Sequence, residues 1–327
     1  MPIYIRRREF GAGAAWLLVA EFTLASAALA QGWPTHPVRI VVPYAPGGST
    51  DVVARVIAER LSRIWGQQVV IENKPGAGTS FGSEAVAKSD PDGYTVLMGT
   101  STLATTRNLY RSLHYAISDL APVTVVCTFP LLMLVPNSSP AKSVAEFIAF
   151  ARENKGKVTF ASPGIGTTPH LAGESFKRMF GVQMTHVPYR GDAPALTDTM
   201  AGRIDLQIGG PAMLEQVRGG QVRGLAVTTA KRSPAAPELP TVAETGVPGF
   251  DVAGWFALFV PAKTPPAIVE KMQIDTVTAL SDPVVKAKLE KVGMAVSGST
   301  SEELGALLQF EIEKWGAVIK DAKITLD

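Results

Sequence analysis

Short runs of β-branched residues alternate along the chain with segments whose apolar residues recur at helical spacing. The run 38–42 is followed by a glycine- and proline-containing loop and then by segment 52–65, where apolar residues stand three or four positions apart. The same order returns with a strand-like run at 69–71, a second such loop and a helical segment at 81–88. This alternation predicts an α/β fold in which a largely parallel sheet carries helices on both faces.

The rest of the chain repeats the alternation and marks several helix starts. Ser143 with Glu146, and Thr300 with Glu303, have the spacing of capping boxes, in which a hydroxyl and a carboxyl group accept hydrogen bonds from backbone N–H groups. Asp282 before a proline predicts another start. Further strands are predicted at 95–98, 123–127, 131–135, 158–161, 183–188, 225–228 and 256–260, and further helices at 169–180 and 192–200.

Composition limits the classes of protein and partner. The chain has 327 residues, 46% of them hydrophobic, which is enough for a large core and for roughly two domains. It carries 31 Lys and Arg against 29 Asp and Glu, and no basic run follows residue 8, so nucleic acid is not expected as a partner. Cys127 is the only cysteine in the sequence, which excludes an intrachain disulfide and a thiolate metal cluster.

Residues 1–30 have the pattern of an export signal peptide. Arginines at 6–8 precede a small and apolar stretch at 11–30, which ends in the A-L-A pattern that signal peptidase reads. Glu21 in the middle of the stretch argues against a membrane-spanning helix. The R-R-E-F sequence at 7–10 also fits twin-arginine export, so the route stays open between that system and the general secretory one. We predict cleavage before Gln31 and a periplasmic mature protein.

One pattern leaves a catalytic alternative. Residues 78–82 match G-x-S-x-G, which in α/β-hydrolases places a nucleophilic serine, here Ser80, on a sharp turn after a strand. A six-residue loop containing a proline separates Ser80 from the preceding strand, so a helix start capped by Ser80 is the simpler interpretation. The four histidines lack metal-site spacing. No catalytic residue, metal or cofactor is predicted, and a secreted serine hydrolase stays the alternative.

Four glycine-rich turns each precede a helix, at 43–51, 74–79, 162–168 and 189–192. Glycine lets backbone N–H groups approach a ligand, and the positive end of a helix dipole attracts an anion. Singly, each turn is equally well a plain connection, with Asp51 and Asp192 as helix caps and Arg190 as a surface charge. Together, they predict a cleft that holds an anion through main-chain and hydroxyl groups.

The residues of these turns, with others, resemble a known family. The motifs, in chain order, are P-Y-A-P-G-G at 43–48 with Asp51, N-K-P-G-A-G at 73–78, D-G-Y-T at 92–95, S-P-G-I-G-T at 162–167 with His170, V-P-Y-R-G at 187–191 and L-P-T-V-A-E at 239–244. They resemble the Bug family, the periplasmic substrate-binding receptors of tripartite tricarboxylate transporters, from about residue 33 to the C-terminus.

This resemblance implies a two-domain periplasmic-binding-protein fold of type II, the Venus flytrap, in which each domain is a mostly parallel sheet flanked by helices. Domain I is expected at 33–122 plus 225–264 and domain II at 123–224, with the chain crossing near Pro122 and returning near Gly224. The C-terminal segment 265–327 is left unassigned.

The resemblance also implies the ligand-binding residues, from loops of both domains. In domain I they are Tyr44, Gly47, Gly48, Asp51, Ala77, Gly78, Thr79, Thr100 and Ser101, and in domain II they are Ser162, Gly164, Thr167, Thr168, Tyr189, Gly191 and Gly209.

The chain departs from the family pattern at two of these positions. Members commonly have glycine where Thr79 stands, and often an aspartate where Gly209 stands. Because Gly209 offers no carboxylate to a ligand ammonium group, a plain mono- or dicarboxylate or an aromatic acid is expected rather than an amino acid.

The resemblance implies a receptor without catalysis. It would capture a small carboxylate between two lobes, close around it and present it to the membrane permease subunits of a tripartite tricarboxylate transporter. A receptor that serves a sensor kinase without a transporter is a further alternative. We expect a monomer.

Overall fold

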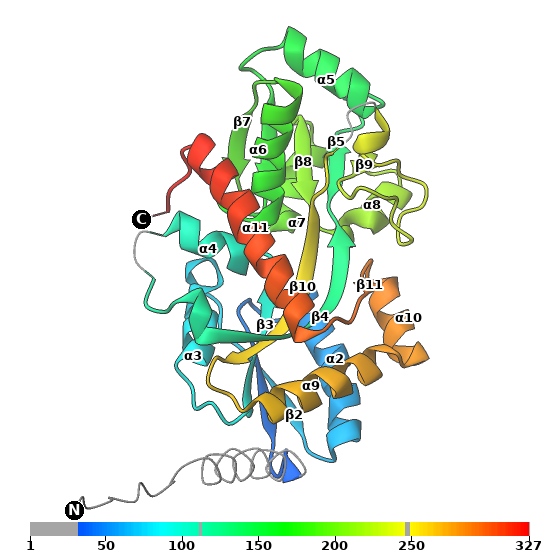
Figure 1. The fold of residues 1–327 in the computed structure, drawn as a ribbon. Coiled ribbons are helices and arrows are strands. Elements are labelled where there is room, and N and C mark those ends of the chain that lie inside the picture. The colour runs from blue at the N-terminus through cyan, green and yellow to red at the C-terminus, as the bar shows by residue number, and fades with distance from the viewer. Residues whose placement is uncertain (1–31, 111–112, 246–248, 327) are drawn as a thin grey trace, which may run out of the picture.

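The computed structural model describes residues 32–110, 113–245 and 249–326, which form two lobes, each built on one sheet with helices against it (Figure 1). The expected signal peptide, 1–30, lies outside the described residues. No helix within the described ranges has the length and apolar character needed to cross a membrane.

The first lobe holds a six-stranded sheet in which parallel and antiparallel pairs are separated in space. β1 pairs in parallel with β2 and β3, whereas β10 pairs antiparallel with β3 and β4, and β11 antiparallel with β4. The strands, in their order across the sheet, are β11 (Ala295–Val296), β4 (Leu120–Pro130), β10 (Ala253–Pro261), β3 (Thr95–Thr100), β1 (Val38–Val42) and β2 (Val69–Asn73).

The second lobe repeats this arrangement with five strands. β6 pairs in parallel with β7 and β8, and β5 pairs antiparallel with β8 and β9. Parallel pairing is thus confined to the outer three strands of each lobe, a smaller part than expected, because the strands that connect the lobes join antiparallel. The order is β7 (Thr185–Pro188), β6 (Thr159–Ser162), β8 (Leu206–Gly209), β5 (Leu132–Val135) and β9 (Arg223–Val227).

Amphipathic helices cover the first sheet. In α2 (Ser49–Trp65), Val53, Ile57 and Leu61 are fully buried, which is the stripe that the sequence pattern predicted. Burial of one such side chain contributes about 1.5–3 kcal/mol. The other helices of this lobe are α3 (Ser80–Ala87), α4 (Leu103–Leu109), α9 (Pro266–Leu280) and α10 (Pro283–Lys291), with 3₁₀ turns at Ala77–Thr79 and Ile117–Asp119.

The second lobe has its own helices and a core rich in phenylalanine. Phe147, Phe160 and Phe176 are buried there together. The helices are α5 (Val144–Glu153), α6 (Thr168–Phe180), α7 (Asp192–Met200) and α8 (Leu214–Arg218), with 3₁₀ turns at Pro211–Met213 and Ala243–Thr245.

The chain crosses between lobes later than the sequence analysis expected. Pro122 lies inside β4 of the first sheet, and the second sheet begins with β5, so the first crossing is at Leu131. Gly224 lies inside β9 of the second sheet, and β10 returns to the first sheet only at Ala253. A change of lobe leaves no signal in a strand's own hydrophobic pattern, because both lobes bury these strands.

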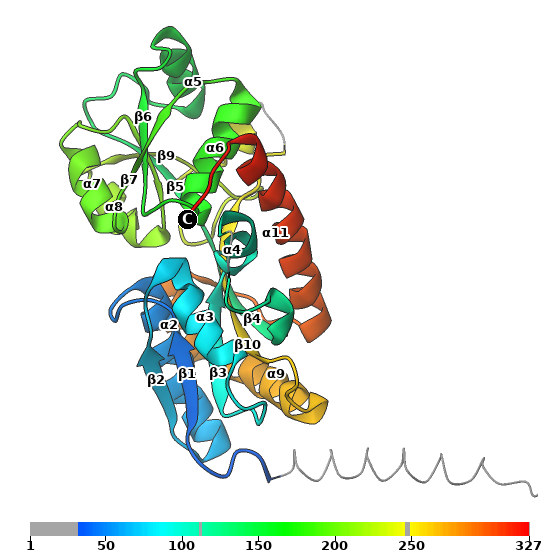
Figure 2. The ribbon, with the colours of Figure 1, turned by 90° about the vertical axis from the view of Figure 1, so that its left-hand side faces the viewer.

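The C-terminal segment divides between the lobes. α9 and α10 pack on α2 of the first lobe. α11 (Ser301–Asp321) runs along the edge of both lobes, in contact with α4, β4 and α6 (Figures 1 and 2). An ion pair of 2.7 Å between Arg178 Nη1 and Asp321 Oδ2 joins its end to α6. The helix therefore spans the connection between the lobes.

Helix starts were predicted with mixed success. Thr300 and Glu303 form the capping box, and Asp282 caps α10. Ser143 caps α5, but the Glu146 carboxylate accepts from the N–H of Lys142 and completes no box. The short helix α4 has no counterpart in the prediction.

Candidate functional site

A cavity of about 430 Å³ lies between the lobes; we call it the interlobe cavity. The first lobe contributes the start of α2 and the end of β3, and the second contributes the starts of α6 and α7 and the segment after β8. Its lining residues are Tyr44, Gly48, Ser49, Thr50, Thr100, Ser101, Thr102, Phe129, Leu131, Pro163, Thr167, Thr168, Pro169, Arg190, Gly191, Asp192, Gly210, Pro211 and Phe256.

The loop before α2 is held by a buried carboxylate. Asp51 accepts hydrogen bonds from the N–H of Gly47, from Asn73 Nδ2 and from the Arg55 guanidinium, at 2.9–3.0 Å. The hydrogen bond from Arg55 is the main cause that lowers the pKa of Asp51 to about 2. Gly47 has a φ of 87°, which a residue with a side chain seldom adopts. Asp51 thus positions the loop and is not a simple helix cap.

Hydroxyl groups gather on the first-lobe wall. The Tyr44 hydroxyl lies 3.3 Å from both Thr100 Oγ1 and Thr102 Oγ1. Ser101 Oγ lies 2.7 Å from Thr168 Oγ1 of the second lobe, a buried hydrogen bond that joins the two lobes beside the cavity. A second hydrogen bond between the lobes runs from Thr105 Oγ1 to the carbonyl of Gly166.

Two helices begin at the cavity without a side-chain cap. The N-caps of α2 and α7 are Gly48 and Gly191, and neither makes a side-chain cap hydrogen bond. By contrast, Ser143, Thr167, Asp282 and Thr300 cap their helices with side-chain oxygens. The first N–H groups of α2 and α7, one helix from each lobe, are therefore available to an acceptor in the cavity.

A stacked histidine pair supports the β6–α6 loop. The rings of His170 and His186 lie 3.8 Å apart at 17°, and His186 Nε2 lies 2.7 Å from Ser162 Oγ. His170 Nδ1 accepts from the N–H of Gly166. Burial lowers the pKa of His170 to about 3 and that of His186 to about 4. Both rings are therefore neutral at pH 7, and His170 has a role in the loop beyond that of an ordinary helix residue.

The loop at 77–79 adopts left-handed backbone without lining the cavity. Ala77, Gly78 and Thr79 have φ values of 44°, 57° and 84°. Thr79 is buried, and its Oγ1 has no hydrogen-bond partner among the described residues. A Cβ on Gly78 would lie 2.7 Å from the Tyr110 hydroxyl oxygen, so this loop packs against the segment after α4.

The structure brings part of the predicted site together. Tyr44, Gly48, Thr100, Ser101, Thr167, Thr168 and Gly191 line the interlobe cavity. The other nine predicted residues are not in its lining: Gly47, Asp51, Ala77, Gly78, Thr79, Ser162, Gly164, Tyr189 and Gly209. As ligand-binding residues, all sixteen stay predictions. Of these, Tyr189 donates from its hydroxyl to Asp198, and burial is the main cause that raises its pKa to about 12.

Sequence reasoning missed two kinds of lining residue. Phe129 and Phe256, whose rings lie 4.8 Å apart, and Leu131 form an apolar wall at the crossing strands. Their sequence pattern is that of ordinary core residues, so no local signal distinguishes them. Asp192 belongs to the predicted glycine-rich turn 189–192 but is not among the predicted binding residues, although its place before a helix is a usable signal.

The geometry gives the hydrolase alternative no support. Ser80 is the first residue of α3, it is buried, and its Oγ has no hydrogen-bond partner among the described residues. A nucleophile needs a base within hydrogen-bond reach. Nor does Ser80 cap the helix as expected, because the N-cap is Thr79 and no side-chain cap bond forms there.

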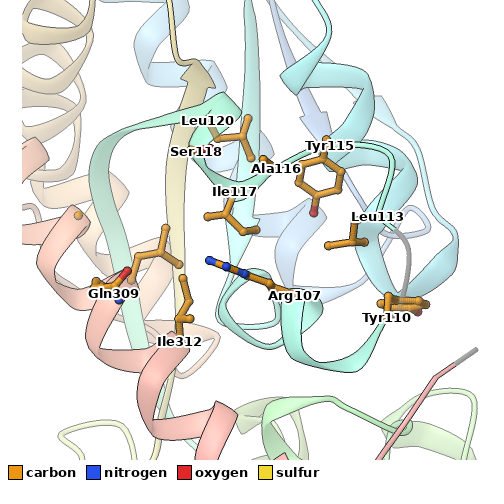
Figure 3. Close-up of a pocket in the computed structure, with 12 residues that line it drawn as sticks. Arg107, Tyr110, Leu113, Tyr115, Ala116, Ile117, Ser118, Leu120, Gln309 and Ile312 are labelled. Atoms are coloured by element: carbon orange, nitrogen blue, oxygen red, sulfur yellow. The ribbon is translucent and has the colours of Figure 1, made fainter.

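A wider cavity of about 580 Å³ lies outside the interlobe site, where α4 and the start of β4 face α11. Figure 3 shows Arg107 extending from α4 toward Gln309 and Ile312 of α11. None of the predicted binding residues lines this cavity, and we assign it no role.

Comparison with known proteins gives a consistent relationship. The model of the family described as "Tripartite tricarboxylate transporter family receptor" matches residues 53–324. A protein in the tcbD-tcbE intergenic region of Pseudomonas sp. strain P51 is 37% identical, covering 98% of this chain and 96% of that protein. Protein BugT of Bordetella pertussis is 34% identical, covering 93% of this chain and 95% of BugT.

Solved structures agree with this relationship. An R. palustris protein, in a structure with adipate, is 40% identical and superposes with a TM-score of 0.82, covering 90% of this chain and 99% of that one. MatC from Rhodopseudomonas palustris, with bound malate, is 31% identical with a TM-score of 0.77, covering 88% of this chain and 100% of MatC. Both matches include both lobes of the described structure.

Proposed function

The chain belongs to the tripartite tricarboxylate transporter family of periplasmic solute-binding receptors, and we propose that it captures a small organic carboxylate between its lobes for uptake by such a transporter. The ligand is a mono- or dicarboxylate or an aromatic acid. The permease subunits of the transporter are the membrane partner, and residues 1–30 direct export to the periplasm.

One observation carries this proposal: uncapped starts of α2 and α7 meet at the interlobe cavity from opposite lobes. A carboxylate at such a start accepts backbone hydrogen bonds and is stabilised by the helix dipole, by up to about 2 kcal/mol in a partly buried place. The apolar wall of Phe129, Leu131 and Phe256 suits the carbon chain of the ligand. The adipate and malate complexes of the two relatives support the same ligand class.

Capture follows from contacts with both lobes. The closed arrangement alone offers the ligand the polar groups of both lobes, so the ligand shifts an open–closed equilibrium by the difference in its affinity for the two states. The closed receptor is then the form that the permease subunits recognise.

A thermal-shift screen of ligand-stripped protein against mono-, di- and aromatic carboxylic acids tests the ligand class. An acid at about 100 times its Kd adds about 2.7 kcal/mol to the free energy of unfolding, so we expect Tm to rise by several degrees. If no acid raises Tm, and calorimetric titration also detects no binding, the proposed function is wrong.

A pair of variants at one position tests the anion site itself. Ser49 is the first helical residue of α2, where proline is tolerated but removes one cavity-lining N–H group. We expect Ser49→Pro to weaken binding of the best acid at least about tenfold, or about 1.4 kcal/mol. Ser49→Ala, which keeps the N–H group, is the matched control and should bind within about threefold of the wild type. Equal affinity in Ser49→Pro would show that the anion binds elsewhere.

A further inference from the structure

Two aspartates stand at helix starts near the interlobe cavity, and their surroundings differ. Asp51 on α2 accepts from three donor groups, those of Gly47, Asn73 and Arg55. Asp192, the first residue of α7, receives a single bond of 3.3 Å, from the N–H of Gly210 to its Oδ2. Its Oδ1 is buried and has no hydrogen-bond partner among the described residues. The protein itself thus satisfies the carboxylate of Asp51 and leaves that of Asp192 incomplete.

The space beside Asp192 is kept open by a glycine. A Cβ on Gly209 would lie 2.5 Å from Asp192 Oδ1 and would also clash with Met213 Cε. Any side chain at 209 would displace the carboxyl group. Gly209 therefore lets α7 supply a carboxyl group at the end of β8, in the place that a side chain of residue 209 would occupy.

Asp192 lies at the boundary between the cavity and the lobe interior, with its Oδ1 packed beside Gly209. It lines the interlobe cavity together with Arg190, Gly191 and Gly210. It makes no cap bond to α7. An unpaired buried polar atom destabilises the fold, and more so when the group is charged, so such an atom needs an explanation such as a ligand.

The charge of the Asp192 carboxyl group limits which ligand groups can bind beside it. Burial raises the pKa of Asp192 to about 6, so the group is mostly ionised at pH 7.5 and accepts hydrogen bonds. A second carboxylate beside it would be repelled unless a proton is shared between them. Arg190 is the other charged residue in the cavity lining and attracts carboxylates, so its contribution must be separated from that of Asp192.

We propose that Asp192 determines the specificity of the cavity by requiring the bound acid to present a hydrogen-bond donor at the end that enters the second lobe. The donor is a hydroxyl, an ammonium or a neutral carboxyl group. This inference rests on the proposed function, since it assumes that the carboxylate at the other end of the ligand binds at the start of α2. It also revises the argument from Gly209, because the carboxyl group absent at that position is supplied by residue 192.

Acids matched in length test this requirement by calorimetric titration at pH 7.5. The probes are butyrate, 4-hydroxybutyrate, 4-aminobutyrate and succinate, with the corresponding six-carbon series of hexanoate, 6-hydroxyhexanoate, 6-aminohexanoate and adipate. We expect a hydroxyl or ammonium acid to bind at least about tenfold more tightly than the plain acid of its series. For the dicarboxylates, affinity should rise by a similar factor from pH 7.5 to pH 5.5, because binding takes up a proton. The dicarboxylates are also titrated into the variant Arg190→Gln. Their affinity for this variant should still rise from pH 7.5 to pH 5.5.

Variants of Asp192 separate a specificity role from a structural one. Asp192→Asn should lose the preference for a donor end while keeping or raising Tm, because it removes a poorly paired buried charge. A structural aspartate would instead lower Tm. Glu153→Gln, at an exposed position of the same lobe, makes the same change of charge and should keep the preference.

Moving the carboxyl group provides the decisive variant. Asp192→Gly should lose the preference, and combining it with Gly209→Asp should restore at least part of it, because a side chain at 209 begins in the space that the Asp192 carboxyl group occupies. If the wild type binds acids with no preference for a donor end, or Asp192→Asn keeps that preference, the inference is wrong while the proposed function stands. If no acid binds at all, both fail.

Discussion

Asp51 shows how one side chain organises a binding loop without lining the cavity. Its carboxylate bonds to Gly47, Arg55 and Asn73, and so ties together the loop before α2, the helix itself and the end of β2. This carboxylate is directed back to the loop, and it leaves the N–H groups at the start of α2 without a side-chain cap.

Asp51→Asn tests this role through pH. The pKa of Asp51 falls from its ordinary value of 3.8 to about 2 in the folded protein, so its contribution is complete above pH 4 and is lost as pH falls through 2. We expect the variant to lower the free energy of unfolding by about 1 kcal/mol at pH 7, since Arg55 is half exposed and its hydrogen bond is screened.

Urea unfolding at pH 7 and at pH 2.5 measures this difference, which should shrink at the lower pH. Glu59→Gln, an exposed carboxylate on the same helix that pairs with Arg63 and Lys288, is the control and should behave as the wild type at pH 7. A difference that stays constant with pH would contradict the ionised role of Asp51.

At the scale of elements, the β6–α6 loop depends on the stacked histidine pair. His186 forms a hydrogen bond with Ser162, and His170 accepts one from the N–H of Gly166. Both ends of the loop are therefore bonded to neutral imidazoles. A neutral ring is needed for His170 Nδ1 to accept its hydrogen bond.

His186→Gln should reduce the acid sensitivity of the fold. Burial, followed by the charge of Lys177, lowers the pKa of His186 from 6.5 to about 4, so the unfolded chain takes up its proton first. Stability is therefore complete above pH 6.5 and falls as the pH drops toward 4. We expect the fall in Tm between pH 7 and pH 4.5 to be smaller in the variant, as measured by circular dichroism. An unchanged slope would mean that other groups govern acid unfolding.

At the scale of the whole molecule, α4 and the β6–α6 loop join the lobes beside the cavity. The bond between Ser101 Oγ and Thr168 Oγ1 is buried, and α11 contacts both α4 and α6 along the outer edge. Closing of the lobes and formation of this hydroxyl pair should therefore be coupled.

A double-mutant cycle measures that coupling in the affinity for the best acid of the screen. Ser101→Ala and Thr168→Val should each weaken binding about fivefold, which corresponds to about 1 kcal/mol. The double variant should lose little more than either single one, because each change already breaks the shared bond. Ser297→Ala, at an exposed position, is the control. If the two losses add, the two hydroxyl groups act independently in the bound state.

The sequence by itself determined most of the elements and the family. Strand and helix periods such as the stripe Val53, Ile57 and Leu61 follow from local burial, and glycine-rich turns follow from backbone conformation, so both leave a pattern that can be read along the chain. Seven of the binding residues that the family resemblance implies line the interlobe cavity, because the motifs that carry the resemblance are local in sequence.

Only the tertiary structure decided which groups meet. The crossing at Leu131, the apolar wall of Phe129 and Phe256, and the carboxyl group of Asp192 in the space beside Gly209 all depend on contacts between segments far apart in sequence. Such contacts are selected by the packing of whole lobes, and no single segment carries a record of the partner it will meet.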